Sequence, residues 1–357
     1  MVFDNHKLDH LARNLVKVKQ KRDGFCYFQR FTDEQLTVYA QRPLFRQGAK
    51  CPAGVYLLFK TNGTKISFEC QKEPAWQLIF TLVREMGKVR LIENIKKTRK
   101  YSNSGGNLQF PAAFDLYANG QKIASPQLKS GTIEIDLANE AKADVLVKLY
   151  LPLLTNAGIR NLTSDGVIQA VPETKAKFYA LGDSITQGYT TTNPSTCYVT
   201  LVADALHLDG HNQGVGGYHY DAAVLNGFTT LPRPKFITVA YGTNDWFFNP
   251  DLNSIRENVR SFYQKLNLLF SDTPIFAITP FWRADMNERQ KCGQFLDVIR
   301  LIEKEASGYP NLIVIDGLQI SPQENSYYAD GFLHPNADGF AYIAEKLVPI
   351  IAARINA

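Results

Sequence analysis

The second half of this chain of 357 residues alternates almost wholly apolar runs with segments of helical length. Four apolar runs begin at Phe178, Phe236, Pro274 and Leu312. Runs that are apolar at every position are typical of parallel strands buried on both faces. We expect helices at about residues 195–208, 252–270, 286–307 and 337–354. The pattern predicts a doubly wound α/β domain, with helices on both faces of a parallel sheet.

The first half of the chain contains short apolar runs separated by Gly, Pro and Asn. Strand candidates begin at Val55, Trp76, Ala113, Thr132 and Val145. Between strands, Asn62-Gly63 and Asn119-Gly120 are typical turns of antiparallel hairpins. Helical spacing is weak except near residues 8–20. This half is predicted to be a β-sandwich.

Length supports a division into two domains, because single cores stop growing at roughly 250–300 residues. The Pro-containing stretch at 170–174 is the natural boundary, which gives domains of 1–174 and 175–357. The first carries 25 Lys+Arg against 16 Asp+Glu, net +9, and the second carries 14 against 18, net −4. We interpret the basic excess mainly as a solvated face and expect no nucleic-acid partner.

The sequence contains no run of about 18 apolar residues, and its first residues mix charged with apolar side chains. We therefore expect neither secretion nor membrane insertion. Five cysteines, at 26, 51, 70, 197 and 292, form no CxxC pair. They fit buried apolar positions in a cytoplasmic protein.

The first apolar run of the second half ends in Gly-Asp-Ser-Ile-Thr-Gln-Gly at 182–188. Ligands of such domains bind beyond the carboxyl ends of the strands, so Ser184 would present its hydroxyl to the crevice. A phosphate loop is excluded because Tyr189 follows Gly188, and a GxSxG elbow because Thr186 takes its last position. Taken alone, Ser184 fits a helix N-cap better than a nucleophile.

Three further blocks change that interpretation. They are Asn-Gln-Gly-Val-Gly-Gly at 212–217, Gly-Thr-Asn-Asp at 242–245 and Asp-Gly-Phe-Leu-His-Pro at 330–335. With 182–188, these blocks resemble the SGNH hydrolase (GDSL esterase/lipase) superfamily over about residues 176–354. The resemblance implies a flavodoxin-like three-layer αβα fold. It places the nucleophile on Ser184, oxyanion donors on Gly217 and Asn244, and the base on His334.

The chemistry of these residues agrees with the resemblance. The amides of Ser184 and Gly217 and the side chain of Asn244 would supply three donors to a tetrahedral oxyanion. Serine needs a base, so His334 would accept its proton and return it to the leaving alcohol. The family usually has DxxH, whereas Asp330 lies four residues before His334. Either Asp330 still orients the imidazole, which we favour, or a main-chain carbonyl does.

The first half also resembles a known domain, though over one short motif. Phe114-Asp115-Leu116-Tyr117 is similar to a signature of the jelly-roll-like sandwich that precedes some bacterial SGNH carbohydrate esterases. Ala113 replaces the usual glycine. Alternation along a strand explains Phe114 and Leu116 but leaves Asp115 unexplained.

Aromatic residues follow the strand ends, and Trp246 and Trp282 are candidates for lining a substrate pocket. Arg283 would either contact a polar substrate group or lie on the surface. No histidine has convincing metal-ligand spacing, and 214–219 lacks the last glycine of a dinucleotide fingerprint, so we expect neither metal nor cofactor.

The sequence therefore predicts a serine esterase that removes short acyl groups, acetyl above all, from a sugar or polyol. One alternative is a lysophospholipase or thioesterase that acts on longer acyl chains. Another is an inactive carbohydrate-binding protein. The expected partner is a small-molecule or glycan ester, with no membrane; an oligomer is compatible with the sequence.

Overall fold

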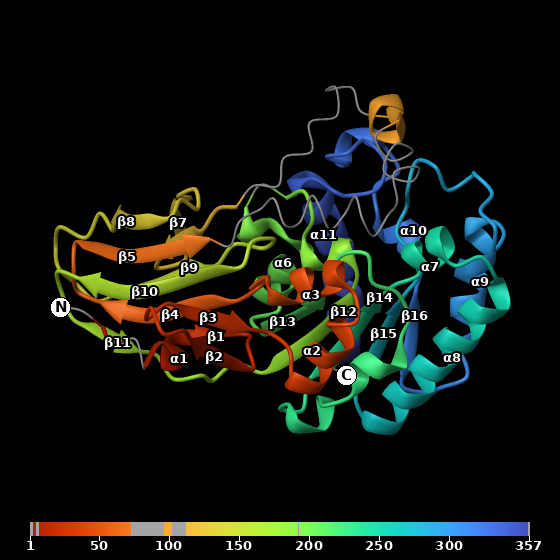
Figure 1. Ribbon diagram of the computed structural model, residues 1–357, viewed down its shortest axis with the longest axis horizontal. Helices are drawn as coiled ribbons and strands as arrows, with labels where there is room; N and C mark the ends of the chain where they lie inside the picture. Colours follow the sequence, from red (N-terminus) through yellow and green to blue (C-terminus); the bar gives the residue numbers. More distant parts are fainter. Residues whose placement is uncertain (1–2, 5–6, 73–95, 102–111, 192, 356–357) are drawn as a thin grey trace.

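The computed structural model describes residues 3–4, 7–72, 96–101, 112–191 and 193–355. It consists of an all-β sandwich, at the left of Figure 1, and an α/β domain at the right. Both predicted fold classes are confirmed. The strand predicted from Trp76 lies outside the described residues.

The α/β domain is built on a parallel sheet in the order β13-β12-β14-β15-β16. Its strands are β12 (Lys177–Gly182), β13 (Asp209–Gly214), β14 (Phe236–Ala240), β15 (Ile275–Ile278) and β16 (Leu312–Ile315). Of these five strands β12 comes first in the chain but lies between β13 and β14, so the order of the strands across the sheet reverses at β12. Such a reversal point is where open α/β sheets bind ligands.

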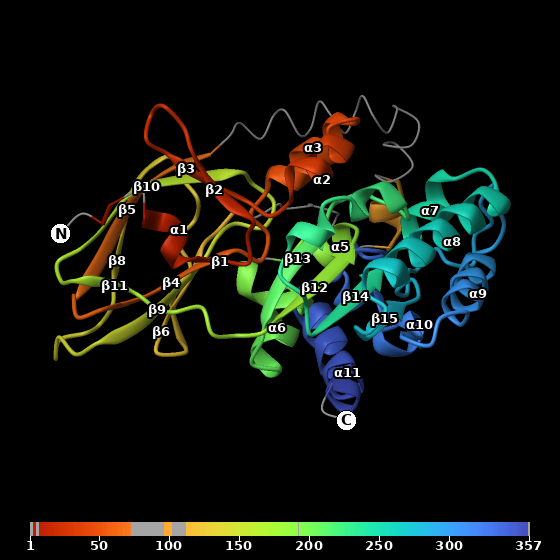
Figure 2. The ribbon, with the colours of Figure 1, turned by 90° about the horizontal axis from the view of Figure 1, so that it is seen from below.

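Successive residues of each strand point to opposite faces of the sheet and belong to two separate apolar cores. Phe178 and Ala180 pack with α6 (Tyr198–Ala205) and α11 (Ala337–Ile355). The alternate positions, such as Tyr179, pack with the two helices on the other face, α8 (Leu252–Leu269) and α9 (Phe295–Ala306). Figure 2 shows these two layers. Burial on both faces explains why β12, β14 and β15 are largely apolar. The edge strand β13 is an exception, because it is buried but polar.

The sandwich consists of two antiparallel sheets around a separate apolar core. One sheet contains β1 (Ala12–Arg13), β4 (Tyr56–Thr61), β9 (Val145–Tyr150), β6 (Asp115–Ala118) and β7 (Gln121–Ala124), with β11 (Ile168–Ala170) on β4. The other contains β2 (Lys17–Gln20), β3 (Cys26–Gln29), β10 (Ala157–Ser164), β5 (Lys65–Lys72) and β8 (Gly131–Asp136).

Of the two hairpin turns predicted in the sandwich, one forms and the other does not. Asn119-Gly120 joins β6 to β7, which pair as the expected hairpin. Asn62-Gly63 does not form a hairpin, because β4 and β5 belong to opposite sheets. The turn crosses between the sheets and is held there by the Asn62 side-chain oxygen, which accepts the Val167 N–H at 2.9 Å.

The helices of the first half are not where spacing predicted. Residues 8–20 contain only α1 (Leu8–Leu11) before β1 and β2 begin. Instead the chain forms α2 (Asp33–Tyr39), which starts at a Thr32–Gln35 capping box, and α3 (Pro43–Lys50). In the second half, α9 begins at Phe295 and not at 286, after Gly293 with a φ of +128°.

Residues of α2 and α3 share a core with the α/β domain and not with the sandwich. Phe31, Tyr39 and Phe45 belong to the cluster that includes Tyr179 and Val215. The division at 174/175 stays a prediction, and the packing shows that residues before it complete the core beyond it. All five cysteines are buried, as expected of apolar side chains, and lie in no disulfide.

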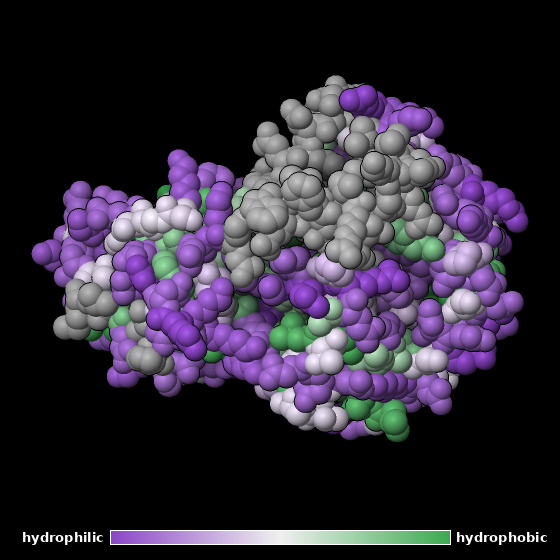
Figure 3. Space-filling view, in the orientation of Figure 1, coloured by the Kyte–Doolittle hydropathy of each residue, from purple (hydrophilic) through white to green (hydrophobic). Residues whose placement is uncertain are grey.

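The described part of the face in Figure 3 is mostly hydrophilic, with smaller apolar patches over the α/β domain. Within the described ranges, no helix combines the length and apolarity needed to cross a membrane.

Candidate active site

Ser184 lies where β12 ends and the one-turn helix α5 (Ser184–Gln187) begins. The N-cap of this helix is Asp183, whose carboxylate accepts the Ile185 N–H at 2.9 Å. The N-cap role considered for Ser184 thus falls to its neighbour. A Cβ on Gly182 would lie 2.0 Å from the Thr186 hydroxyl oxygen, so only glycine permits this tight turn.

A continuous hydrogen-bonded chain links Ser184 to a histidine and a carboxylate. Ser184 Oγ lies 2.9 Å from His334 Nε2, and His334 Nδ1 lies 2.7 Å from Asp330 Oδ2. The carboxylate fixes the proton on Nδ1, which leaves Nε2 free to accept the serine proton. The structure therefore places Asp330, and not a main-chain carbonyl, against the imidazole.

Asp330 reaches His334 because the chain between them is folded back on the same carboxylate. Its second oxygen accepts the backbone N–H groups of Phe332, Leu333 and His334 at 3.1, 2.8 and 3.0 Å. Gly331 supplies the left-handed backbone, with a φ of +79°, that this turn requires. The extra residue relative to DxxH is thus accommodated.

The buried carboxylates near the site differ in pKa. Burial alone would raise the pKa of Asp330, but the charge of His334 and its hydrogen bonds hold that pKa below the ordinary value. Burial raises the pKa of Asp183 to about 6 and that of Asp245 to about 7, because neither has a comparable cationic partner at hydrogen-bond distance. The carboxylate behind the imidazole therefore stays ionised at a lower pH than Asp183 or Asp245.

The predicted oxyanion donors follow the two strands that flank β12. Gly182 is paired with Gly214 of β13 and with Ala240 of β14, so the segments that continue to Gly217 and Asn244 leave the same edge of the sheet. Among the described residues, neither the Ser184 nor the Gly217 amide donates to an acceptor in the chain.

The Asn244 amide is oriented by its neighbours. Its Nδ2 donates to the Tyr218 carbonyl at 2.9 Å and lies 3.4 Å from Asp183 Oδ2. The second hydrogen bond is long and therefore the weaker of the two.

The two tryptophans named from the sequence have different surroundings. Trp246 is fully buried, donates to the Gly293 carbonyl at 3.2 Å and packs edge-on against Phe295. It follows Asn244 by two helical positions, which is a rotation of about 200° away from the site. Trp246 therefore belongs to the core and does not line an open crevice. Trp282 is half-buried beside Tyr328, and its pocket role stays a prediction.

Arg283 is neither on the surface nor open to a substrate. It is buried, with its guanidinium on the Asp285 carboxylate and 3.0 Å from Thr243 Oγ1. Lys97 also contacts Asp285, at 2.5 Å. These charges compensate one another and support the start of α7 (Thr243–Phe248), which carries Asn244.

Residues that the sequence did not single out complete the site. The Gln187 side chain accepts the Gly216 N–H at 2.8 Å and donates to the Gly48 carbonyl at 3.1 Å, which ties the glycine loop to α3. The Tyr189 ring stacks on the His334 imidazole at 5.7 Å. Gln187 lies in the 182–188 block and Tyr189 directly follows it, and this position was the only sign in the sequence that either residue belongs to the site.

The helix α3 also lies against Gly217, one of the predicted oxyanion donors. A Cβ on Gly217, whose φ is +79°, would lie 3.4 Å from Leu44 Cδ2 and 3.5 Å from Phe45 Cε1. Leu44 is only partly buried, so its apolar side chain borders the site. No pattern in the sequence indicated this contact between the two halves.

Arg30 supports the same loop from behind. The fully buried guanidinium of Arg30 donates only to backbone carbonyls, those of Gly48, Cys51, Asn212 and Gly214. Burial lowers the pKa of Arg30 to about 10, so it still carries its charge at neutral pH. One side chain thus joins β13, which leads to Gly217, to α3.

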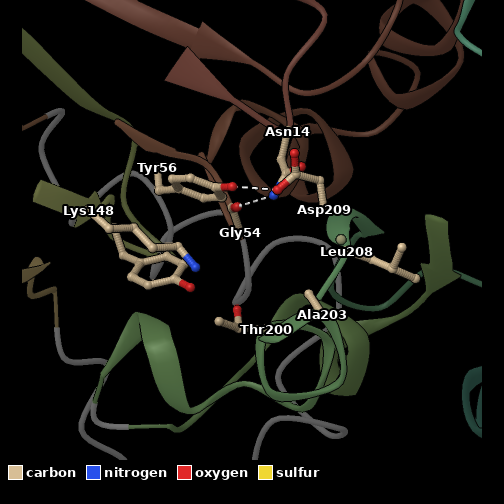
Figure 4. Close-up of a pocket in the computed structure, with 10 residues that line it drawn as sticks. Asn14, Gly54, Tyr56, Lys148, Thr200, Ala203, Leu208 and Asp209 are labelled. Atoms are coloured by element: carbon tan, nitrogen blue, oxygen red, sulfur yellow. Dashed lines mark hydrogen bonds between the residues drawn. The ribbon is translucent and has the colours of Figure 1, made fainter. Parts of the chain in front are cut away.

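A pocket between the domains lies elsewhere. Figure 4 shows Tyr56 and Lys148 of the sandwich facing Thr200 of α6 and Asp209 of β13. Asp209 is the first residue of its strand, so this pocket lies at the amino edge of the sheet, opposite Ser184. It is therefore not part of the candidate active site. In the part of the chain that the structure describes, no group of three His, Cys, Asp or Glu residues is arranged to hold a metal ion.

Comparison with known proteins agrees with this geometry. Residues 180–342 match the model of the GDSL-like lipase/acylhydrolase family. The match covers most of the α/β domain and supports an ester hydrolase. All four sequence blocks lie within the matched range. A search of curated protein sequences finds no match.

Solved structures resemble the chain over both of its domains. The salicylyl-acyltransferase SsfX3 of a tetracycline biosynthetic pathway is 20% identical, with a TM-score of 0.73, over 96% of this chain and 94% of its own. A Bacteroides ovatus protein described as a GDSL-like lipase is 19% identical, with a TM-score of 0.72 and coverages of 99% and 97%. A family two carbohydrate esterase of Cellvibrio japonicus is 16% identical, with a TM-score of 0.63 and coverages of 100% and 97%. At these identities the likeness shows a shared fold.

Proposed function

We propose that the protein is a serine esterase that removes short acyl groups, acetyl above all, from a sugar or polyol. The observation that carries this proposal is the chain Ser184–His334–Asp330, with contacts of 2.9 and 2.7 Å. Nucleophile and base within hydrogen-bond reach, with the base oriented by a third group, are the arrangement that acyl transfer through a covalent intermediate requires.

The reaction proceeds in two halves. Ser184 Oγ attacks the ester carbonyl while His334 Nε2 takes the hydroxyl proton, and the oxyanion is stabilised by the amides of Ser184 and Gly217 and by Asn244. His334 then gives the proton to the leaving alcohol, which departs and leaves an acyl-enzyme. Water attacks the acyl-enzyme, His334 takes its proton, and the carboxylic acid leaves as Ser184 regains its hydrogen.

Two observations support a short acyl group and a hydroxylated alcohol. Leu44 and Phe45 stand against Gly217, which leaves an apolar wall beside the oxyanion position. Among proteins of the same fold is a family two carbohydrate esterase. The full-length likeness to an acyltransferase favours testing, in addition, whether an alcohol can replace water as the acceptor.

Hydrolysis of p-nitrophenyl acetate and p-nitrophenyl decanoate by wild type, Ser184→Ala and Ser271→Ala tests the proposal. Ser271 is an exposed serine, so its variant is a matched control with unchanged activity. We expect preference for acetate and a loss of about 10⁴-fold or more in kcat for Ser184→Ala. A fully active Ser184→Ala enzyme, or a wild type that cleaves neither ester, contradicts the mechanism. A preference for decanoate supports the lysophospholipase or thioesterase alternative.

A further inference from the structure

The Asp115 carboxylate, in β6 of the sandwich, is completely buried and receives hydrogen bonds from both domains. Within the sandwich it contacts Lys122 Nζ at 2.7 Å and accepts the Ser125 hydroxyl at 2.6 Å. Burial works to raise the pKa of Asp115, but hydrogen bonds from Lys122, Ser125 and Ser195 hold that pKa below the ordinary value. Asp115 is therefore an ionised group at the domain interface.

Asp115 accepts hydrogen bonds from two residues of the α/β domain, Asn193 and Ser195, which follow α5 in the chain. Asn193 Nδ2 donates to one carboxylate oxygen at 2.7 Å, and Ser195 donates to the other with its backbone N–H at 3.0 Å and its hydroxyl at 2.5 Å. Charge-assisted hydrogen bonds of this kind are about twice as strong as neutral ones. The sandwich thus fixes the position of Asn193 and Ser195.

The other end of this segment contacts His334. The Tyr189 ring stacks on the imidazole, and the Thr190 hydroxyl lies 2.5 Å from the Tyr189 carbonyl oxygen, 3.1 Å from that of Pro335 and 3.4 Å from that of His334. Thr190 has a φ of +69°, which is unfavourable for a β-branched residue. Such a conformation persists only where its surroundings impose it, as the contacts at both ends of this segment do.

We propose that Asp115 is a positioning residue for the reaction at Ser184, and this inference rests on the proposed function. By holding Asn193 and Ser195, it keeps Tyr189 and Thr190 against the histidine, and so fixes the imidazole relative to the serine. The role needs no contact between Asp115 and substrate. A displacement of about 1 Å at reacting groups can cost on the order of 10²-fold in rate, so a distant anchor can affect turnover.

The test is the rate at which a serine-reactive fluorophosphonate inactivates each folded variant, a reaction in which Ser184 Oγ bonds to phosphorus and fluoride leaves. The variants are Asp115→Asn and the matched control Asp165→Asn. Asp165 is another sandwich carboxylate, held by the Thr64 hydroxyl at 2.6 Å and the Thr64 N–H at 2.8 Å, and its hydrogen bonds among the described residues stay within the sandwich. Both variants lose a multiply bonded carboxylate, but only one faces the His334 segment.

We expect the inactivation rate per folded molecule to fall about tenfold or more in Asp115→Asn, with wild-type rates in Asp165→Asn. A rate within threefold of wild type in Asp115→Asn, even with a lowered Tm, means that Asp115 only joins the domains and overturns the proposal. If Asp115→Asn does not fold, Ser195→Ala removes the hydroxyl hydrogen bond to Asp115, leaves the backbone one, and is held to the same criterion.

A double-mutant cycle with Thr190→Val tests the route of the effect. If Asp115 acts through the segment, the two losses together are smaller than their product. Losses that multiply within twofold overturn the proposal. A wild type that does not react, or a Ser184→Ala variant that reacts equally well, overturns the proposed function itself and with it the role of Asp115.

Discussion

The carboxyl edge of the parallel sheet and the support it receives from the first half of the chain are built in different ways. At the edge, neighbouring residues in the sequence position each side chain of the candidate site. Ser184, for example, is held by the turn that begins at Gly182 and by the helix that ends at Gln187. The support from the first half consists of isolated polar side chains, of which Arg30 and Asp115 are the clearest. A reactive group that depends on a local turn can be recognised as a motif of consecutive residues in the sequence. A contact across a domain interface involves single residues, which no sequence motif marks.

The largest effect is expected at the edge itself, for Asp330→Asn. An amide can still accept the three backbone N–H groups, but its NH₂ would face His334 Nδ1 and impose the wrong tautomer. We expect kcat to fall by about 10³–10⁴-fold with little change in stability. Steady-state kinetics on p-nitrophenyl acetate provide the measurement, with the exposed Asp272→Asn as control. A loss below tenfold would indicate that a main-chain carbonyl can orient the imidazole.

A smaller but still large effect, on stability, is expected for Arg30→Lys in the first half of the chain. An ammonium group keeps the charge but cannot span carbonyls in both domains, and each unpaired buried carbonyl costs about 1–3 kcal/mol. We expect the free energy of unfolding to fall by roughly 2–4 kcal/mol. Urea unfolding measures this, and Arg46→Lys, on the exposed side of α3, is the matched control. Equal stabilities of the two variants would show that the carbonyls find other partners.

The smallest effect is expected where the two regions meet, for Leu44→Ala. Removal of this side chain enlarges the space beside Gly217, so longer acyl groups should gain relative to acetate. One methylene in an apolar pocket is worth about 1–3 kcal/mol, so the ratio of kcat/KM for hexanoate to that for acetate should rise about tenfold. The exposed Leu268→Ala is the control. An unchanged ratio would place the acyl group on another side of the serine.

The edge was largely predictable from the sequence, because four strands of the sheet are apolar runs and three of the four blocks lie at or just after strand ends. The sequence predicted that Ser184, His334 and Asp330 act together, and the structure places the three side chains within hydrogen-bond distance of one another in that order. It failed for Trp246, because the position of an aromatic residue after a strand does not reveal which way a helix will turn it.

The first half was less predictable for physical reasons. Helix α2 has two turns, too few for a periodic pattern, and its capping box at Thr32 was the only strong signal. The turn at Asn62 has the composition of a hairpin, and only its contact with Val167 makes it cross between sheets. Asp115 stood out as a charge that a strand pattern did not explain, but its partners lie about 80 residues further along the chain.

The contacts of Arg30 bear on how such a protein can evolve. Because one guanidinium binds carbonyls in both halves of the chain, and because Phe31, Tyr39 and Phe45 fill the core of the α/β domain, the N-terminal half cannot be exchanged freely. Recombination at the predicted 174/175 boundary would remove part of the interior of the α/β domain. The two halves are therefore constrained to be inherited together.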